Sequence, residues 1–169
     1  MGYGEGYKCS KCGYEYMYGV GVGFLFPKVY EELLEAVKEG EYGEEWKELV
    51  LKTDNVAIDA ETYLYCCKSC GSWKTEEGLS LYVPKDMETL KKKTEEKGSW
   101  CVAFDFNEAK YVTFEELKDY YSILKKYVHK CPKCGKTMHR ATAEDSVNLP
   151  CPKCGGAPEE GYTYFIHWD

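Results

Sequence analysis

The residues best suited to chemistry in this chain are its ten cysteines. Eight of them form four copies of C-x-x-C-G, which are CSKCG at 9–13, CKSCG at 67–71 and CPKCG at 131–135 and again at 151–155. Two intervening residues allow a tight turn to direct both sulfurs at one cation, and the glycine supplies the left-handed backbone conformation that such a knuckle needs. Two knuckles together supply four sulfurs, which match the tetrahedral preference of Zn²⁺. The pattern predicts two four-cysteine metal sites.

The order of the knuckles suggests how they pair. Sixteen residues separate Cys134 from Cys151, a spacing typical of a four-cysteine zinc site. The first two knuckles lie much farther apart, but loop entropy rises slowly with loop length. Interleaved pairing is the alternative, and it would entangle the two sites. The sequence therefore predicts sequential pairing, with a first site of Cys9, Cys12, Cys67 and Cys70 and a second site of Cys131, Cys134, Cys151 and Cys154.

Two closed sites of four thiolates leave no open coordination position, which a catalytic zinc ion requires. We therefore expect two structural zinc ions per chain, with iron as the less favoured metal. No nucleophile–base order, phosphate-binding loop or metalloprotease helix is present, so we expect no enzyme.

The opening segment YKCSKCGYEY, from Tyr7 to Tyr16, resembles the first knuckle of rubredoxin. This resemblance implies an iron electron carrier as an alternative and leaves zinc or iron open at the first site. The second knuckle follows after a far longer stretch than in rubredoxin. The segment 131–169 resembles a zinc ribbon. With GVGFLFPKVYEE, SLYVPK and HKCPKCGKTM, the whole chain resembles a group of small bacterial proteins with two zinc ribbons, a resemblance that implies no activity.

Two histidines and two further cysteines could also take part in the chemistry of the metal sites. His129 and His139 flank the third knuckle, so either could orient a ligand sulfur from outside the metal site. Cys66 should face away from Cys67 by strand alternation, and Cys101 lies in an apolar run. We expect both of these cysteines to behave as small buried hydrophobic residues. Thiol-based redox or metal sensing remains an alternative function.

Charge and composition constrain the partners. The net charge of −7 and the single arginine, Arg140, argue against a nucleic-acid binder. Such binding remains an alternative, through a cluster of Lys133, Lys136, Arg140 and Lys153, with the many tyrosines as a stacking surface. A protein partner is the favoured expectation. With no signal-like start and no apolar run of membrane length, we expect a cytoplasmic protein without membrane contact, where thiols stay reduced.

The elements that position the knuckles are predicted from periodicity. Strands are expected over 14–26, 62–67, 78–84 and 99–106, and helices over 27–39 and 44–51. The pair Thr113 and Glu116 predicts a capped helix that runs to Tyr127. The segment 136–150 should form a strand, a turn near Glu144 and a returning strand, with a third strand over 161–169. The segment 86–98 should be a linker or a frayed helix.

These elements indicate an α+β protein with short antiparallel sheets. We expect a zinc-ribbon module over 1–84 with a helical insertion at 27–53. A linker and strand–helix segment over 85–130 should pack on this module, and a second ribbon should span 131–169.

Overall fold

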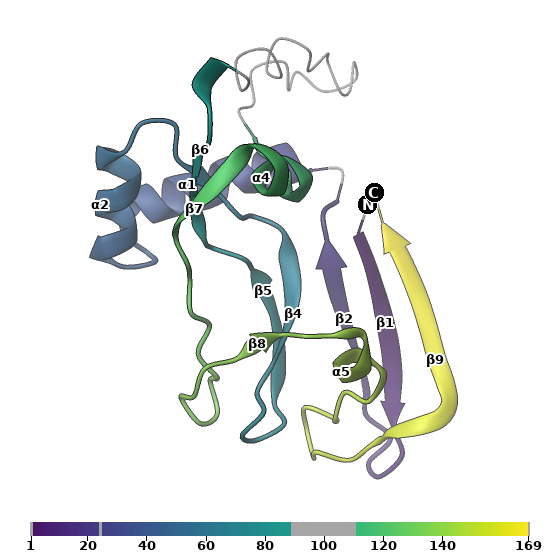
Figure 1. Cartoon of the computed structure of the whole chain (residues 1–169). Coiled ribbons are helices and arrows are strands. Elements are labelled where there is room, and N and C mark those ends of the chain that lie inside the picture. The colour runs from purple at the N-terminus through teal and green to yellow at the C-terminus, as the bar shows by residue number, and fades with distance from the viewer. Residues whose placement is uncertain (1, 24, 89–110, 169) are drawn as a thin grey trace. The chain divides into compact units, whose positions relative to one another are not determined.

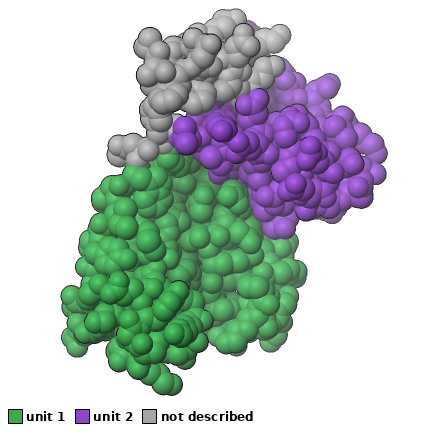
Figure 2. Space-filling view, turned by 180° about the vertical axis from the view of Figure 1, so that it is seen from behind, with its two compact units in different colours: residues 1–24, 61–77, 128–169 green, residues 25–60, 78–127 purple. Residues whose placement is uncertain are grey.

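A computed structural model describes residues 2–23, 25–88 and 111–168. The fold is α+β with antiparallel sheets, as predicted (Figure 1). The chain divides into two compact units, and neither is continuous in sequence. Unit 1 comprises residues 1–24, 61–77 and 128–169, and unit 2 comprises residues 25–60 and 78–127 (Figure 2). The boundaries expected at 84 and 130 do not coincide with these units. No helix among the described residues is long and apolar enough to cross a membrane.

Unit 1 is built on one antiparallel sheet in the order β5-β4-β2-β1-β9, with β8 paired to the end of β4. Its strands are β1 (Gly2–Cys9), β2 (Glu15–Gly21), β4 (Thr62–Cys66), β5 (Trp73–Glu77), β8 (His139–Arg140) and β9 (Pro158–Trp168). Strands β2, β4 and β9 match the sequence prediction. Strands β1 and β5 were missed, because β1 is rich in glycine and β5 is largely charged, compositions that are typical of turns and surfaces.

The glycines of β1 have a packing role that periodicity does not reveal. A Cβ at Gly6 would lie 2.0 Å from the Tyr164 ring, and one at Gly2 would lie 2.2 Å from the Trp168 ring. Aromatic rings of β9 therefore lie directly against the bare backbone of β1. A Cβ at Gly4 would lie 2.4 Å from the Tyr18 carbonyl oxygen on β2. Glycine thus allows β1 to sit closely between its two neighbours.

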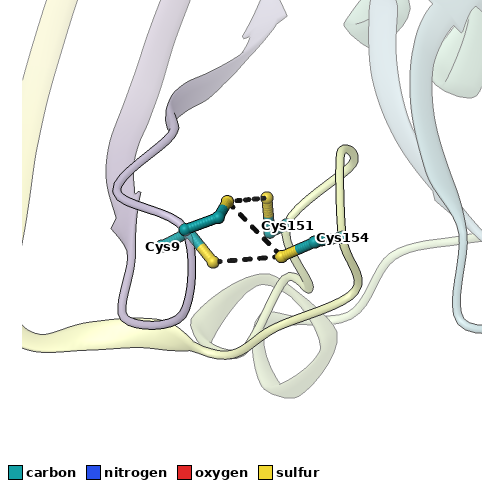
Figure 3. Close-up of side chains that lie close together, drawn as sticks. Cys9, Cys151 and Cys154 are labelled. Carbon is teal, nitrogen blue, oxygen red and sulfur yellow. Dashed lines mark hydrogen bonds between the residues drawn. The ribbon is translucent and has the colours of Figure 1, made fainter.

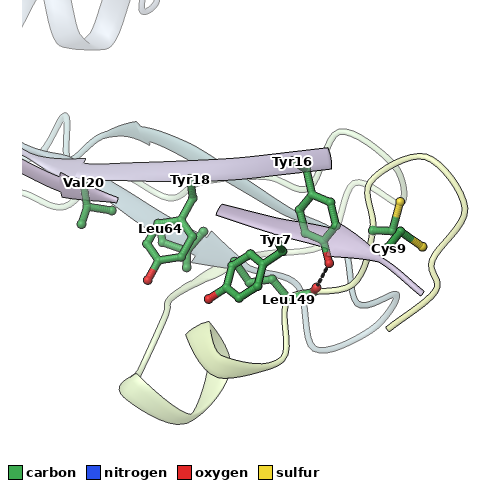
Figure 4. Close-up of a cluster of buried hydrophobic side chains, with 8 residues drawn as sticks. Tyr7, Cys9, Tyr16, Tyr18, Val20, Leu64 and Leu149 are labelled. Atoms are coloured by element: carbon green, nitrogen blue, oxygen red, sulfur yellow. Dashed lines mark hydrogen bonds between the residues drawn. The ribbon is translucent and has the colours of Figure 1, made fainter. Parts of the chain in front are cut away.

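The core of unit 1 lies on one face of this sheet (Figure 4). Aromatic residues of β1 and β2 dominate it, and the Tyr7 and Tyr16 ring centroids are 5.7 Å apart. The Tyr16 hydroxyl donates a hydrogen bond of 2.7 Å to the Leu149 carbonyl, which ties β2 to the C-terminal segment (Figure 4). The cluster consists of Tyr7, Cys9, Tyr16, Tyr18, Val20, Leu64, Leu149 and Cys151. Cys9 and Cys151, the first cysteines of two C-x-x-C-G knuckles, thus belong to the core itself.

Among its described residues, unit 2 combines helices with a three-stranded sheet in the order β3-β6-β7. Its elements are α1 (Phe26–Glu39), α2 (Glu44–Lys52), β3 (Ala57–Ile58), β6 (Leu81–Pro84), α4 (Phe114–Tyr120) and β7 (Tyr121–Lys125). The predicted helices α1 and α2 are confirmed, and Gly40 ends α1 in the left-handed conformation, at φ 95°. The Trp46 indole donates a 2.8 Å hydrogen bond to the Leu79 carbonyl inside the unit.

Two predicted segments are wrong in detail. The helix that begins at the Thr113 capping box ends at Tyr120 rather than Tyr127, because the next residues form β7 and pair with β6. This strand pairing outweighs the helical pattern of the segment. The segment between the third and fourth knuckles holds the two-residue strand β8 and the short helix α5 (Ala143–Val147), which is capped by Thr142.

Two further predictions cannot be compared with the structure. The strand predicted at 99–106 lies outside the described residues, as does most of the segment 86–98.

Candidate metal centres

All four knuckles have the same backbone structure. In each, the glycine N–H donates to the carbonyl of the first cysteine at 2.8 or 2.9 Å. The N–H of that cysteine in turn donates to the carbonyl five residues later, also at 2.8 or 2.9 Å. The four glycines, Gly13, Gly71, Gly135 and Gly155, have φ between 66° and 72°, the left-handed region that residues with a Cβ avoid. The C-x-x-C-G pattern therefore predicted the local geometry correctly.

The knuckles group differently from the prediction. The structure brings Cys9, Cys12, Cys151 and Cys154 together, which we call centre A. It also brings together Cys67, Cys70, Cys131 and Cys134, which we call centre B. Within each centre, all four sulfurs lie within 4.8 Å of one another. The predicted eight cysteines thus form two quartets, but the sequential pairing is corrected to an interleaved one.

Strand pairing explains the interleaved arrangement. The first knuckle is the turn between β1 and β2, and the second is the turn between β4 and β5. Strand β9 pairs with β1 and places Pro158 opposite Cys9, so the fourth knuckle lies beside the first. Strand β8 pairs with β4 and places His139 opposite Cys66, so the third knuckle lies beside the second. The C-terminal segment thus supplies one knuckle to each hairpin.

The geometry of centre A suits a tetrahedral ion (Figure 3). The Cys154 Sγ atom lies 3.5 Å from the Cys9 Sγ atom and 3.4 Å from the Cys12 Sγ atom. The Sγ atoms of Cys12 and Cys151 are 3.8 Å apart. Four sulfurs about 2.3 Å from a central zinc ion would be roughly 3.8 Å apart. A disulfide needs an S–S distance of about 2.05 Å. Cys9 and Cys151 are buried, whereas Cys12 and Cys154 are exposed.

A close glycine contact also distinguishes centre A. A Cβ at Gly156 would lie 3.0 Å from the Cys9 sulfur and 3.3 Å from the Cys154 sulfur. It would also lie 2.9 Å from Lys11 Cβ. Sequence reasoning missed this residue, although the GG pair after the fourth knuckle was visible in the sequence.

Centre B has similar distances and one additional polar group. Its Sγ atoms are 3.5 Å apart for Cys67 and Cys134, and 3.6 Å apart for Cys70 and Cys131. The Ser72 hydroxyl lies 3.0 Å from the Cys70 sulfur and 2.9 Å from the Cys131 sulfur. Sequence reasoning missed Ser72, whose only signal was its place two residues after a ligand.

The pKa values in the two quartets show why a cation fits them. The Ser72 hydroxyl lowers the pKa of Cys131 to about 6. Burial raises the pKa of Cys9, but the backbone N–H groups of Cys12 and Lys11 outweigh burial and lower it to about 6. The N–H of Gly156 lowers the pKa of Cys154, but the neighbouring sulfurs of its quartet and burial raise it to about 12. Four sulfurs this close cannot all be thiolates unless a cation offsets their charge.

The histidines near the third knuckle belong to neither quartet. His129 is buried, with its Nδ1 atom 2.9 Å from Glu76 Oε2 and its ring stacked on Tyr65 at a centroid distance of 3.8 Å. His139 Nε2 lies 3.0 Å from Asp145 Oδ2. Both imidazoles therefore have a carboxylate partner.

Two cysteines, Cys66 and Cys101, are not part of the four C-x-x-C-G knuckles. Cys66, which was expected to be buried, is half-buried and packs against the core cluster, and burial raises its pKa to about 11. Cys101 lies outside the described residues.

Comparison of the chain with known proteins gave no match to a family model, to a curated protein or to a solved structure. The candidate function therefore rests on the two quartets and on the fold that forms them.

Proposed function

We propose that this chain is a two-zinc protein in which each ion has a structural role. One observation carries the proposal: each quartet joins a hairpin turn in the N-terminal half of the chain to a knuckle from the C-terminal segment. An ion at each centre would hold segments that are distant in sequence, and structural zinc can contribute on the order of 10–16 kcal/mol to folding. Four sulfur ligands at each ion leave no position for a substrate, so the proposed protein is not an enzyme.

The donor set suits zinc or iron better than the hard divalent cations. Four thiolates favour Zn²⁺ or iron over the hard cations Mg²⁺ and Ca²⁺, which prefer oxygen ligands. Iron in a four-cysteine site is the alternative that the first knuckle supports through its likeness to rubredoxin. Metal analysis together with the visible absorption spectrum separates the two, because zinc has no visible band.

We further propose that unit 1 presents a binding surface to a protein partner. Large apolar side chains are exposed on its adjacent strands β1 and β9, with Tyr3 48% and Phe165 67% exposed. Exposed aromatic residues are typical of protein interfaces. The nucleic-acid alternative is weaker, because the guanidinium of the single arginine, Arg140, already lies over the Tyr63 ring at 3.5 Å. We place the protein in the cytoplasm, where the thiols would stay reduced.

Paired serine substitutions test both the metals and the grouping. The native chain should hold two zinc ions by native mass spectrometry. Cys9→Ser with Cys151→Ser removes two ligands of centre A, so this variant should retain one ion. Cys9→Ser with Cys67→Ser removes one ligand from each centre and should reduce the content of both ions. A native chain without bound metal would refute the proposal, and the reverse pattern in the two variants would restore sequential pairing.

A further inference from the structure

The two quartets are not equivalent, and the difference lies in the groups around the sulfurs. In centre A, the exposed cysteines Cys12 and Cys154 come from different knuckles, and their sulfurs are 3.4 Å apart. In centre B, Cys134 is exposed and Cys70 is half-buried. The Cys12–Cys154 sulfur pair of centre A thus lies at the surface, whereas the Cys67–Cys134 and Cys70–Cys131 pairs of centre B are partly buried.

A hydroxyl group adds a second difference. Ser72 Oγ lies 3.0 Å from the Cys70 sulfur and 2.9 Å from the Cys131 sulfur, one from each knuckle of centre B. Once a metal ion has displaced the thiol protons, both sulfurs can only accept hydrogen bonds, so the hydroxyl must donate. Its one hydrogen serves one sulfur at a time. A donated hydrogen bond withdraws charge from the sulfur lone pairs and makes them poorer nucleophiles.

Centre A has no serine at the corresponding position. The residue two places after Cys12 is Tyr14, which is 44% exposed. The Ser10 hydroxyl, also in the first knuckle, donates to the Ala157 carbonyl at 3.0 Å and is therefore already engaged.

We propose that centre A is a peroxide-sensitive metal site and that Ser72 protects centre B, so that the two ions are released in a fixed order. This inference rests on the proposed metal binding and assigns a regulatory role to one centre. The fold makes the order possible because separate hairpins carry the two centres.

The oxidation balances with a peroxide as the two-electron acceptor. The Cys12 thiolate attacks one peroxide oxygen, an S–O bond forms, the O–O bond breaks, and hydroxide leaves. The Cys154 thiolate then attacks the sulfenic sulfur, an S–S bond forms, the S–O bond breaks, and a second hydroxide leaves. Two solvent protons convert the two hydroxides to water. The disulfide removes the Cys12 and Cys154 thiolates from centre A, so only Cys9 and Cys151 would remain to hold an ion there.

The test follows metal release from the full chain in its two-metal form after addition of hydrogen peroxide. A chromogenic chelator should detect a fast and a slow phase of equal size. Mass spectrometry after the fast phase should find one ion remaining and a Cys12–Cys154 disulfide. Addition of a thiol reductant and zinc should restore the two-metal form.

Serine variants test the protective role. Ser72→Ala should accelerate the slow phase by about tenfold, the scale of one charge-assisted hydrogen bond lost, and leave the fast phase unchanged. Ser72→Thr keeps the hydroxyl and should restore the slow phase. Ser69→Ala, which changes an exposed serine of the same knuckle, is the matched control and should have no effect.

Each outcome has a distinct meaning. Release of both ions in one phase from the native chain would overturn the inference, as would a Ser72→Ala slow phase equal to that of the native chain. In either case the native chain would still contain two ions, so the proposed structural role would stand. A chain that never binds metal would remove the proposed function itself.

Discussion

At the scale of single residues, the four knuckles share one backbone conformation but differ in the side-chain and glycine contacts around their sulfurs. The four glycines after the second cysteines occupy the same left-handed conformation, and nothing lies near the position of an added Cβ. Gly156 is different, since it follows the knuckle glycine and lies directly against sulfurs of centre A. Glycine is therefore required at position 156 because a Cβ would lack room there, and not because of the backbone conformation.

Gly156→Ala should weaken metal binding at centre A only. The added Cβ would press on the Cys9 sulfur and on Lys11 Cβ, and crowding of this kind costs about 1–3 kcal/mol. We expect the affinity for one of the two ions to fall by roughly tenfold or more, as measured by competition with a chelator.

The matched control is Lys136→Ala, at the equivalent position of the third knuckle, where a side chain is already accommodated. Its two ions should be held as in the native chain. Equal loss of affinity at both centres in Gly156→Ala would contradict the assignment.

At the scale of elements, β1 is the strand on which unit 1 depends. It lies between β2 and β9 and ends in the first knuckle, so its position determines where two ligands of centre A lie. Its alternate glycines admit the rings of β9 on one face, while Tyr7 enters the core on the other. The close packing of β1 against its neighbours therefore also determines the positions of the two centre A cysteines in the first knuckle.

Gly4→Ala should destabilise unit 1. The new Cβ would lie 2.4 Å from the Tyr18 carbonyl oxygen, a backbone atom that cannot move without shifting β2. We expect a loss of about 1–3 kcal/mol in the free energy of unfolding, measured by chemical denaturation of the metal-bound protein.

Tyr3→Ala, a change at the neighbouring exposed position, should cost less than about 0.5 kcal/mol, as surface substitutions usually do. If the two variants unfold at the same denaturant concentration, the close packing of β1 is not what stabilises this sheet.

At the scale of the whole molecule, the proposed metal ions should stabilise one of the two units and not the other. Both candidate metal centres lie in unit 1. Unit 2 has its own buried side chains, among them Tyr30, Val37, Ile58 and Leu117, and none of the eight ligands. Its stability should therefore not depend on an ion at either centre.

Removal of the metal ions should unfold unit 1 and leave unit 2 folded. After chelation, hydrogen exchange followed by mass spectrometry should show loss of amide protection in β1 and β9. Protection in α1 should persist, because burial of apolar side chains and not an ion holds that helix.

Addition of zinc should return the protection of β1 and β9. Loss of protection in α1 to the same extent as in β1 would show that the two units unfold as one.

The sequence by itself determined the local chemistry. The spacing of C-x-x-C-G identified all eight cysteines of the two quartets, and the Pro27 and Gly40 signals located α1. These features depend on residues a few positions apart, so the pattern of residue types is sufficient to predict them.

Only the tertiary structure decided which knuckles meet. Four identical knuckles carry no information about their partners, and the local sixteen-residue spacing suggested the wrong pair. The partners follow from the pairing of β9 with β1 and of β8 with β4. That pairing depends on glycines that accept aromatic rings and on a core shared by segments from both ends of the chain. Because such contacts join residues far apart in sequence, no local pattern could have revealed them.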